Sequence, residues 1–308
     1  MNISDKWIFI INPVAGGGFA AGLEGKILEM AKRFNITAET VFSEKRGHAS
    51  FLSEKYAAEG YTHIIGVGGD GTFNEVAAPL INRKKVITGL VSAGTGNDFI
   101  QILGFPDRFD DSHWEQLFRC EVIPMDAGSC NGMIFLNGMG LGFDAQVASE
   151  NYSAPGEVKK GGKNKYIWHI LKTILFYREK TMTVLNNGER TQTDCFINTV
   201  AVGRRFAGGF FLTPKAIAND GLLDVCSVKR LTIPQRLSIL MMVPKGTHIN
   251  DKKVNYYQTD KLSLEFGEKV PYHLDGELYF SEKFDISVMK QSLNVIYNPH
   301  GDHYFDLP

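Results

Sequence analysis

Two glycine-rich segments carry the residue types that could bind a polyphosphate. Gly68–Glu75 reads Gly-Gly-Asp-Gly-Thr-Phe-Asn-Glu, and Gly94–Phe99 reads Gly-Thr-Gly-Asn-Asp-Phe. Glycines let the main chain approach phosphate oxygens because they have no Cβ. The carboxylate of Asp70 would repel bare phosphate, so its position indicates a Mg²⁺ ion, or metal-bound waters, between the two. The pair of segments predicts a site for a metal-bound polyphosphate.

Both segments also have a plainer interpretation. Gly68–Glu75 could be a tight turn in which Asp70 and Thr72 cap the following helix. Gly94–Phe99 alone would be an ordinary capping motif. No G-x-x-x-x-G-K-[ST] pattern occurs in the sequence, which excludes a P-loop kinase.

A third glycine-rich segment lies near the start of the chain. Gly16–Ala21 fits the dinucleotide-binding pattern G-x-G-x-x-G/A, and Glu44 falls near the place of a ribose-binding acid. Asn12-Pro13, however, puts a proline inside the turn, and the pattern alone is weak. A dehydrogenase of the Rossmann type is therefore a distant alternative.

The elements that would position these turns alternate between strand and helix. Helical spacing or length predicts helices at Leu23–Phe34, Gly47–Tyr61 and Phe73–Ile81. Strands are predicted at Trp7–Ile11, Ile36–Phe42, Thr62–Val67 and Val86–Val91. Such alternation predicts a parallel sheet covered on both faces. Because ligands bind at the carboxyl ends of strands in open α/β sheets, three glycine turns at that edge favour a polyphosphate site.

From about Val122 the pattern changes to strands separated by turn signals such as Asp220-Gly221. This predicts a mostly antiparallel β domain with a few inserted helices. Asp275-Gly276-Glu277, taken alone, is best interpreted as a hairpin turn followed by a solvated acid. The predicted strands are Met133–Asn137, Thr181–Leu185, Cys195–Val202, Leu222–Val228, Leu262–Phe266, Phe284–Met289 and Leu293–Tyr297.

One segment of this second half has two interpretations. Ser153–Lys165 is predicted to be a loop, and Lys165–Lys180 an amphipathic helix. Packing of that helix on a sheet is the ordinary outcome; contact with a membrane surface, through aromatic residues and a basic rim, is the alternative. Its apolar stripe consists of Ile167, Ile170, Leu171, Ile174 and Leu175.

Composition limits the class of protein. A length of 308 residues suggests two domains, and a formal net charge of −1 gives no global field toward nucleic acid or anionic lipid. The four cysteines are far apart, as expected for reduced thiols in the cytoplasm. No apolar run approaches the ~18–20 residues of a transmembrane helix. We expect a cytoplasmic protein without a nucleic-acid partner, so any membrane contact must come from a local patch.

Taken in order, Asn12-Pro13, Gly68–Glu75, Gly94–Phe99 and Asp275-Gly276-Glu277 resemble the motifs of the diacylglycerol-kinase catalytic family. Sphingosine and ceramide kinases are similar in the same motifs, and the resemblance covers essentially the whole chain. It implies an NAD-kinase/phosphofructokinase-like α/β domain over residues 1–122 and a β-sandwich lipid-substrate domain over 123–290. Residues 291–308 would return to the first domain, and the active site would lie in the cleft between the two.

The resemblance also implies roles for individual residues. Asp70 and Glu277 would be catalytic, with Glu277 as the base that deprotonates the lipid hydroxyl. Ile217, Asp220 and Leu222 would hold a structural Mg²⁺ through two carbonyls and a carboxylate. Glu75, Asn97 and Asp98 would support the site. The ATP site would be lined by Asn12, Pro13, Val14, Ala15, Gly16, Ser43, Gly68, Gly69, Asp70, Gly71, Thr72, Phe73, Asn74 and Thr95.

Two positions depart from the family pattern. Ala15 stands where many relatives carry a serine, so one hydroxyl near the phosphates would be missing. Ser43 replaces the usual threonine and keeps the hydroxyl.

The expected activity is Mg²⁺-dependent transfer of the ATP γ-phosphoryl group to a lipid hydroxyl at the membrane surface. Diacylglycerol, giving phosphatidic acid, is the first candidate acceptor; a sphingoid base, ceramide or a glycolipid are the others. An NAD kinase, which shares the Gly-Gly-Asp-Gly-Thr loop, and a catalytically silent lipid-binding regulator also remain. Transient peripheral contact with the membrane is expected, and the oligomeric state stays open, a homodimer included.

Overall fold

The computed structural model describes residues 5–154, 157–158, 172–186 and 188–307. The chain divides into two compact units, each described here by itself. Unit 1 comprises Met1–Ala127, Ile217–Asp220 and Met289–Pro308, and unit 2 comprises Gly128–Ala216 and Gly221–Val288. The division after Ala127 lies slightly beyond the predicted boundary at residue 122. Unit 1 also takes in Ile217–Asp220, which the sequence pattern had assigned to the second half.

Unit 1 is built on a parallel sheet with the strand order β2-β1-β3-β4-β15. All residues of β1 are buried, which explains why its sequence, Trp-Ile-Phe-Ile-Ile, is a continuous apolar run instead of an alternating one. The predicted parallel pairing is therefore present. The strands are β1 (Trp7–Ile11), β2 (Ala38–Phe42), β3 (His63–Gly68), β4 (Ile87–Ser92) and the last residues of β15 (Glu277–Ile296).

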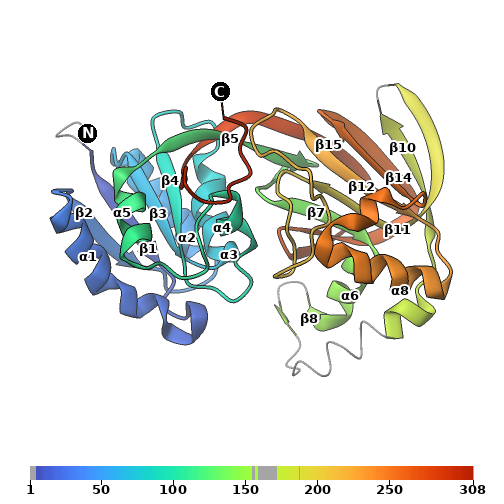
Figure 1. Ribbon diagram of the computed structural model, residues 1–308, viewed down its shortest axis with the longest axis horizontal. Helices are drawn as coiled ribbons and strands as arrows, with labels where there is room; N and C mark the ends of the chain where they lie inside the picture. Colours follow the sequence, from blue (N-terminus) through green and yellow to red (C-terminus); the bar gives the residue numbers. More distant parts are fainter. Residues whose placement is uncertain (1–4, 155–156, 159–171, 187, 308) are drawn as a thin grey trace. The chain divides into compact units, whose positions relative to one another are not determined.

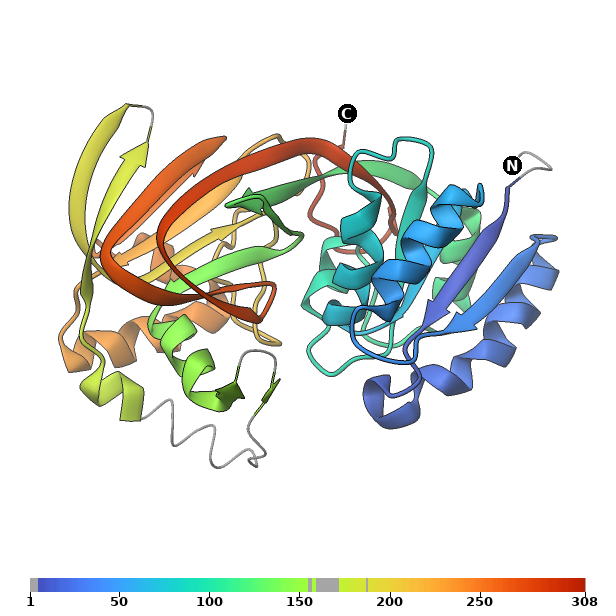
Figure 2. The same ribbon diagram turned by 180° about the vertical axis from the view of Figure 1, so that it is seen from behind.

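Helices cover both faces of this sheet (Figures 1 and 2). On one face Phe118 of α5 stacks on Trp7 and on Phe34, which follows α1. On the other face the Ser53 hydroxyl of α2 donates to the Val76 carbonyl of α3. The helices are α1 (Glu24–Arg33), α2 (His48–Ala58), α3 (Asp70–Ala77), α4 (Asp98–Ile102) and α5 (Asp111–Arg119), with short 3₁₀ turns η1 (Ala15–Gly18), η2 (Ala20–Leu23) and η3 (Ala78–Leu80).

Unit 2 is built on antiparallel strands, as predicted. β11 and β14 are long strands, and both β10 and β7 pair with them, β10 along one part of their length and β7 along another. β12 and β13 extend the sheet beyond β11, and β15 extends it beyond β14. The strands are β6 (Met133–Phe135), β7 (Gly138–Gly142), β10 (Lys180–Asn186), β11 (Glu189–Ala201), β12 (Leu223–Lys229), β13 (Val254–Thr259) and β14 (Lys261–Leu274).

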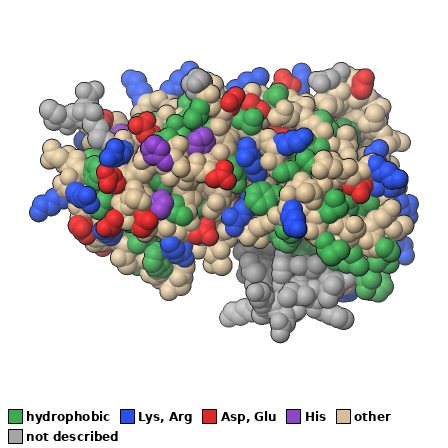
Figure 3. All heavy atoms as spheres, viewed as in Figure 1, with side chains coloured by type: hydrophobic (Ala, Val, Ile, Leu, Met, Phe, Trp, Pro, Cys, Tyr) green, Lys and Arg blue, Asp and Glu red, His purple; other side chains and the backbone are tan. Residues whose placement is uncertain are grey.

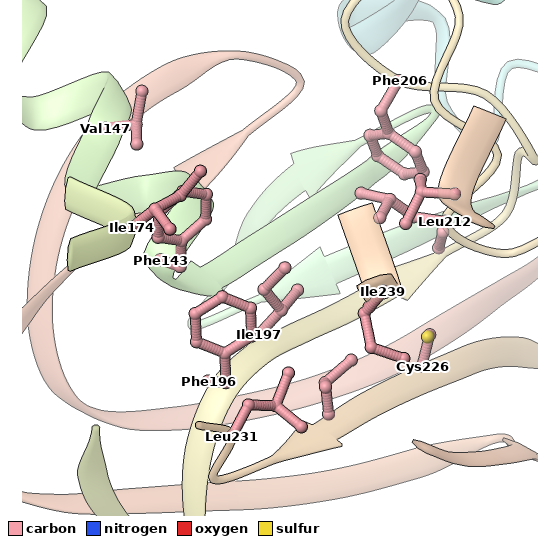
Figure 4. Packing of buried hydrophobic residues seen from close by; sticks show 13 residues of the cluster. Phe143, Val147, Ile174, Phe196, Ile197, Phe206, Leu212, Cys226, Leu231 and Ile239 are labelled. Carbon is pink, nitrogen blue, oxygen red and sulfur yellow. The ribbon is translucent and has the colours of Figure 1, made fainter. Parts of the chain in front are cut away.

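Helices of unit 2 pack on this sheet around one hydrophobic cluster. Figure 4 shows Phe143, Phe196, Ile197 and Ile239 among its members. The elements that supply it beside the strands are α6 (Phe143–Asn151), α8 (Ile233–Met242), η4 (Val243–Lys245) and a short helical stretch at residues 172–176. η5 (Thr247–Asn250) follows η4.

Two strands belong to both units. β5 (Val122–Cys130) leaves unit 1 and β15 returns to it. The sequence predicted two strands, Phe284–Met289 and Leu293–Tyr297, where the structure has the single strand β15. The predicted break survives as a kink, because Gln291 has a left-handed φ of 46° and its amide donates to Oδ1 of buried Asp126 at 2.6 Å.

Part of the predicted loop Ser153–Lys165 is paired instead: β8 (Tyr152–Ala154) lies antiparallel to β9 (Glu157–Val158). Of the predicted amphipathic helix Lys165–Lys180, residues 165–171 lie outside the described part of the chain. Within the described part, Ile174 is buried whereas Leu175 is exposed, so the predicted stripe does not face the core as a whole.

The cysteines are free, as predicted. Burial raises the pKa of the Cys130 and Cys226 thiols to about 12, so both are protonated at neutral pH. No helix within the described ranges is long and apolar enough to cross a membrane.

Candidate functional site

The carboxyl ends of the unit 1 strands carry three glycine turns that meet in space. A Cβ at Gly16 would lie 2.2 Å from the Ala93 carbonyl oxygen, which follows β4. A Cβ at Gly94 would lie 2.5 Å from Cα of Gly69, which follows β3. Contacts this close exclude any other residue type at Gly16 and Gly94. We call the turns at Gly16–Gly18, Gly68–Gly71 and Gly94–Gly96 the glycine edge.

Asp70 joins two of these turns. Its Oδ1 accepts a hydrogen bond from the Phe99 amide at 2.9 Å, and its Oδ2 accepts one from the Asp98 amide at 3.1 Å. Those amides open α4, so the carboxylate caps that helix and meets the positive end of its dipole. The plainer interpretation, in which Asp70 caps the helix that follows it, is wrong, because the N-cap of α3 is Gly69 and no side chain bonds there.

The N-cap residue of the Gly94–Phe99 segment does not cap α4 through its side chain either. Asn97 occupies the N-cap of α4 with a left-handed φ of 53°, and its side-chain amide donates to the Gly94 carbonyl at 3.1 Å. The Oδ1 atom of Asn97 is buried and has no hydrogen-bond partner within the described part of the protein. A buried acceptor in this state is available to a ligand.

The two turns rest on aromatic side chains. Phe73 and Phe99 stack with ring centroids 4.2 Å apart, and Phe73 is completely buried. The Phe73 ring therefore supports the turn, and only its backbone can face a nucleotide. Thr72 is also buried, and its hydroxyl accepts a hydrogen bond from the Asn12 side-chain amide at 3.0 Å. Asn12 thereby ties the loop after β1 to the start of α3.

Glu75 braces the other side of α3. Its two carboxylate oxygens accept hydrogen bonds from the Gly47 amide at 2.9 Å and the Ala49 amide at 3.2 Å, at the start of α2. Ser43, predicted to contact ATP, is buried, and its amide donates to the Ile11 carbonyl. Thr95 and Val14, by contrast, are exposed.

The first glycine turn does not have the dinucleotide-binding geometry. Gly16, Gly17 and Gly18 all have positive φ values of 61°, 67° and 97°. These glycines lie in the 3₁₀ turn η1, the 3₁₀ turn η2 follows, and α1 begins only at Glu24, so the motif does not open an α-helix. The G-x-G-x-x-G/A match of Gly16–Ala21 is therefore coincidental.

Arg108 contacts the glycine edge, and no sequence pattern predicted this role. Its guanidinium donates to the Gly94 carbonyl at 3.2 Å and lies 4.6 Å from the centre of the Phe19 ring. Both partners lie far away along the chain, in loops without periodicity, so no local pattern could have indicated these contacts.

In unit 2, Asp275-Gly276 forms the hairpin turn between β14 and β15, as its spacing predicts. The two residues have φ values of 46° and 87°, as a type I′ turn requires. The Asp275 carboxylate accepts hydrogen bonds from the amides of Leu136, Asn137 and Gly138 at 2.7–3.0 Å. Glu277 follows as the first residue of β15, half-buried and opposite Leu274.

Unit 2 contains a histidine–carboxylate pair that no sequence pattern predicted. Nε2 of His273 on β14 lies 3.2 Å from Oδ2 of Asp144 at the start of α6. A Cβ at Gly140 would lie within 2.3 Å of both groups, so only glycine at this position leaves room for the pair.

No described residues form a group of three or more His, Cys, Asp or Glu side chains that could hold a metal ion. The predicted structural Mg²⁺ set needs only one carboxylate, so it stays a prediction. Ile217 and Asp220 lie in unit 1 and Leu222 lies in unit 2. The intervening segment is anchored, because the Ala218 amide donates to the Tyr304 carbonyl and Asn219 exchanges two hydrogen bonds with the Asp306 backbone.

The sequence matches two known protein domain families. The diacylglycerol kinase catalytic domain matches residues 6–130, and the YegS C-terminal NAD kinase beta sandwich-like domain matches residues 138–297. The chain belongs to the diacylglycerol kinase family. It is a lipid kinase with two domains, and its co-substrate is ATP.

Similar proteins agree with this assignment. The chain is 26% identical over 272 residues to a diacylglycerol kinase of Bacillus subtilis (strain 168), covering 87% of this chain and 88% of that one. It is 26% identical to a protein named probable lipid kinase YegS-like from Shewanella frigidimarina (strain NCIMB 400), covering 81% of each. The crystal structure of a diacylglycerol kinase from Bacillus anthracis str. Sterne shares the fold, with a TM-score of 0.74, 21% identity and coverage of 96% and 97%.

Proposed function

We propose that this lipid kinase transfers the γ-phosphoryl group of ATP to the hydroxyl of diacylglycerol, giving phosphatidic acid. The observation that carries the proposal is the glycine edge, where three turns lie in backbone contact at the carboxyl ends of parallel strands. Diacylglycerol is favoured as acceptor because the Bacillus subtilis relative carries that name. The name of the YegS-like relative says lipid kinase without specifying the lipid. Sphingoid bases, ceramide and glycolipids must therefore be tested beside diacylglycerol.

The start of α3 would hold the phosphates. Its first turn is Asp70-Gly71-Thr72, and the amides at a helix N-terminus have no partner within the helix and a partial positive charge. Gly71 has open space at its Cβ position, so a phosphate oxygen can approach its backbone closely. The proposed ATP-binding residues are Asn12, Pro13, Val14, Ala15, Gly16, Ser43, Gly68, Gly69, Asp70, Gly71, Thr72, Phe73, Asn74 and Thr95.

The residues beside this turn suit Mg²⁺. Each Asp70 oxygen accepts one amide and keeps a second acceptor position, and Asn97 has an unpartnered buried oxygen nearby. Mg²⁺ prefers such hard oxygen donors and retains several waters. A bound ion would neutralise charge on the transferring phosphoryl group. Asp70 and Asn97 would orient its waters, while Asp98 begins α4.

Glu277 is proposed as the general base that accepts the proton of the lipid hydroxyl. The Asp275 carboxylate and the hairpin turn fix the backbone two residues before it, which suits a positioned base. Such a base typically contributes about 10²–10⁴-fold to the rate. The proposal requires Glu277 of unit 2 to reach the acceptor of a nucleotide held by unit 1.

A structural Mg²⁺ at Ile217, Asp220 and Leu222 is proposed separately. Its test is thermal unfolding with and without Mg²⁺ in EDTA-treated protein. Mg²⁺ should raise the Tm of the wild-type chain but not of Asp220→Ala. Equal shifts in both proteins would remove this site from the proposal.

The experiment that tests the function is a phosphorylation assay with labelled ATP and a panel of acceptors. Short-chain diacylglycerol, sphingosine, ceramide, a monoglycosylated diacylglycerol and NAD would be compared at equal concentrations, and the products identified by mass. We expect phosphatidic acid to form at the highest kcat/KM. Preference for another lipid would move the assignment within the family, and turnover of no lipid would contradict it. We further propose that the enzyme acts at the cytoplasmic face of the membrane.

A further inference from the structure

Helix α8 of unit 2 presents apolar side chains to solvent. Ile233, Leu237 and Met241 recur every four residues and therefore share one face, and Met241 is 75% exposed. The face turned to the core contains Arg236, Ile239 and, just after the helix, Val243. Within the described residues, the outward stripe is therefore left partly exposed, Met241 most of all.

The neighbouring helical residues 172–176 carry further exposed apolar side chains. Their inward side chain, Ile174, belongs to the same hydrophobic cluster as Ile239 (Figure 4). Leu175 and Phe176 are exposed, Phe176 by 74%. We call Leu175, Phe176, Ile233, Leu237 and Met241 the apolar platform.

Arg236 holds the two parts of the platform together. Its guanidinium donates to the carbonyls of Ile174 and Tyr177 and forms an ion pair of 2.7 Å with Glu179. Both charged side chains are almost completely buried. Because removing one member of a buried pair is costly, this clamp fixes α8 against residues 172–177.

The two chain segments that carry the platform contain basic but no acidic residues, and Asp194 of β11, outside them, pairs with Arg230 at 3.5 Å. No Asp or Glu occurs between Asp224 and Asp251, and none between Lys172 and Arg178. The exposed cations in these segments are Lys172, Arg178, Lys229, Arg230 and Lys245. Figure 3 shows hydrophobic spheres gathered over α8 and the neighbouring short helix, with Lys and Arg spheres at their margin. A chain with net charge −1 therefore has a local basic rim around exposed apolar residues.

We propose that the apolar platform docks on an anionic bilayer surface. Aliphatic and aromatic side chains would enter the boundary between head groups and acyl chains, and the basic rim would face anionic phosphates. The inference rests on the proposed function, because an enzyme that phosphorylates a lipid must meet its acceptor at an interface. A second copy of the chain is a poorer occupant, because two platforms would bring like charges together.

Vesicle co-sedimentation of the full chain tests this proposal. Wild-type protein is compared with Leu237→Gln/Met241→Gln on phosphatidylcholine vesicles with and without about one-third phosphatidylglycerol. We expect wild type to bind the anionic vesicles and the double variant to bind at least about ten-fold more weakly. Leu28→Gln on α1 is the matched control, since Leu28 is 43% and Leu237 is 44% exposed. It should bind like wild type.

A second pair of substitutions tests the basic rim in the same vesicle experiment. Lys229→Gln/Lys245→Gln should reduce binding to anionic vesicles about ten-fold while leaving the weak binding to phosphatidylcholine unchanged. The platform proposal is overturned if wild type ignores anionic vesicles or if both double variants bind as it does. It is also overturned if analytical ultracentrifugation shows a wild-type dimer that Leu237→Gln/Met241→Gln dissociates.

Activity on a dispersed short-chain diacylglycerol separates this proposal from the proposed function. Both double variants should retain wild-type kcat/KM on that monomeric acceptor and lose activity only on vesicle-borne lipid. If wild type phosphorylates no lipid but the vesicle results hold, the function fails and the platform stands. If the variants keep full activity on vesicles, the platform fails and the kinase assignment stands.

Discussion

The two units each contain an aspartate whose carboxylate bonds to backbone amides, and the two differ in what surrounds it. Asp275 in unit 2 accepts three amides from the segment Leu136–Gly138, and its turn is a compact hairpin. Asp70 in unit 1 accepts two amides and joins turns whose glycines press backbone on backbone. The Asp275 carboxylate stabilises a turn within unit 2. The Asp70 carboxylate joins two turns of the glycine edge, where backbone amides remain available to a ligand.

Glu277→Gln, next to the Asp275-Gly276 hairpin turn, should cause the largest loss of kcat. Loss of the proposed base should lower kcat at least about 100-fold, while the Kd for ATP stays within about two-fold, because the proposed nucleotide site lies in unit 1. Steady-state kinetics and isothermal titration with a non-hydrolysable ATP analogue measure the two quantities. Turnover close to wild type would refute the base assignment.

Asp70→Ala is the counterpart on the glycine edge. It removes the cap of α4 and the carboxylate that would orient metal-bound waters, so both kcat and ATP affinity should fall, the latter by about ten-fold. The same titration and kinetics check it. A variant that loses kcat with unchanged ATP affinity would show that Asp70 does not hold the nucleotide turn.

Asp275→Ala should act on stability first. Three amides lose a charged acceptor, which should cost about 3 kcal/mol in the free energy of unfolding. Urea titration measures the loss. Asp275→Asn is the control, because asparagine tolerates the left-handed backbone and keeps one acceptor oxygen. Equal losses in both variants would mean that the negative charge, and not the hydrogen-bond geometry, stabilises the turn.

A buried histidine in unit 1 should also make the stability of the protein depend on pH. Burial lowers the pKa of His63 in unit 1 from 6.5 to about 4. The unfolded chain therefore binds a proton that the folded chain refuses, and stability falls as the pH falls from about 6.5 toward 4, by at most about 3 kcal/mol.

His63→Phe keeps an aromatic ring beside Trp7 and should flatten this pH dependence. Part of the slope should remain, because burial also lowers the pKa of His248 in unit 2. Denaturant unfolding at several pH values gives the slope. An unchanged slope in His63→Phe would exclude His63 as a contributor.

Gly71→Ala gives the smallest change in stability and the sharpest view of the glycine edge. Nothing lies within 4 Å of its Cβ position, so alanine should stabilise α3 by about 0.5–1 kcal/mol. A methyl group there would nevertheless keep phosphate away, and ATP affinity should fall. Gly25→Ala on α1 has equally open space and should stabilise without affecting ATP. Equal ATP affinity in both variants would place the phosphates elsewhere.

Local patterns predicted the elements of unit 1 well. Trp7–Ile11 is apolar throughout because it is buried on both sheet faces, and the glycine turns follow their strands as expected. The capping of α4 by Asp70 could not be predicted, because donor and acceptor lie on different turns. The same holds for Arg108, which is recognisable only from its contacts in space.

Unit 2 shows a different limit of sequence patterns. Ile233, Leu237 and Met241 have the spacing of a core-facing stripe, yet the face of α8 turned to the core carries Arg236. A buried arginine with three acceptors reverses the usual assignment of faces. No helix was predicted at these residues, and helical spacing alone does not tell which face of α8 is buried.

The parallel pairing of β15 with β4 has a consequence for biosynthesis. Asn294 and Val295 of β15 complete the unit 1 sheet, whose other strands are translated before them. Until these two residues have been translated, β4 keeps an unpaired hydrogen-bonding edge next to apolar residues. Nascent chains of this kinase should therefore be prone to aggregate or to require a chaperone, and truncation after residue 127 should yield insoluble material.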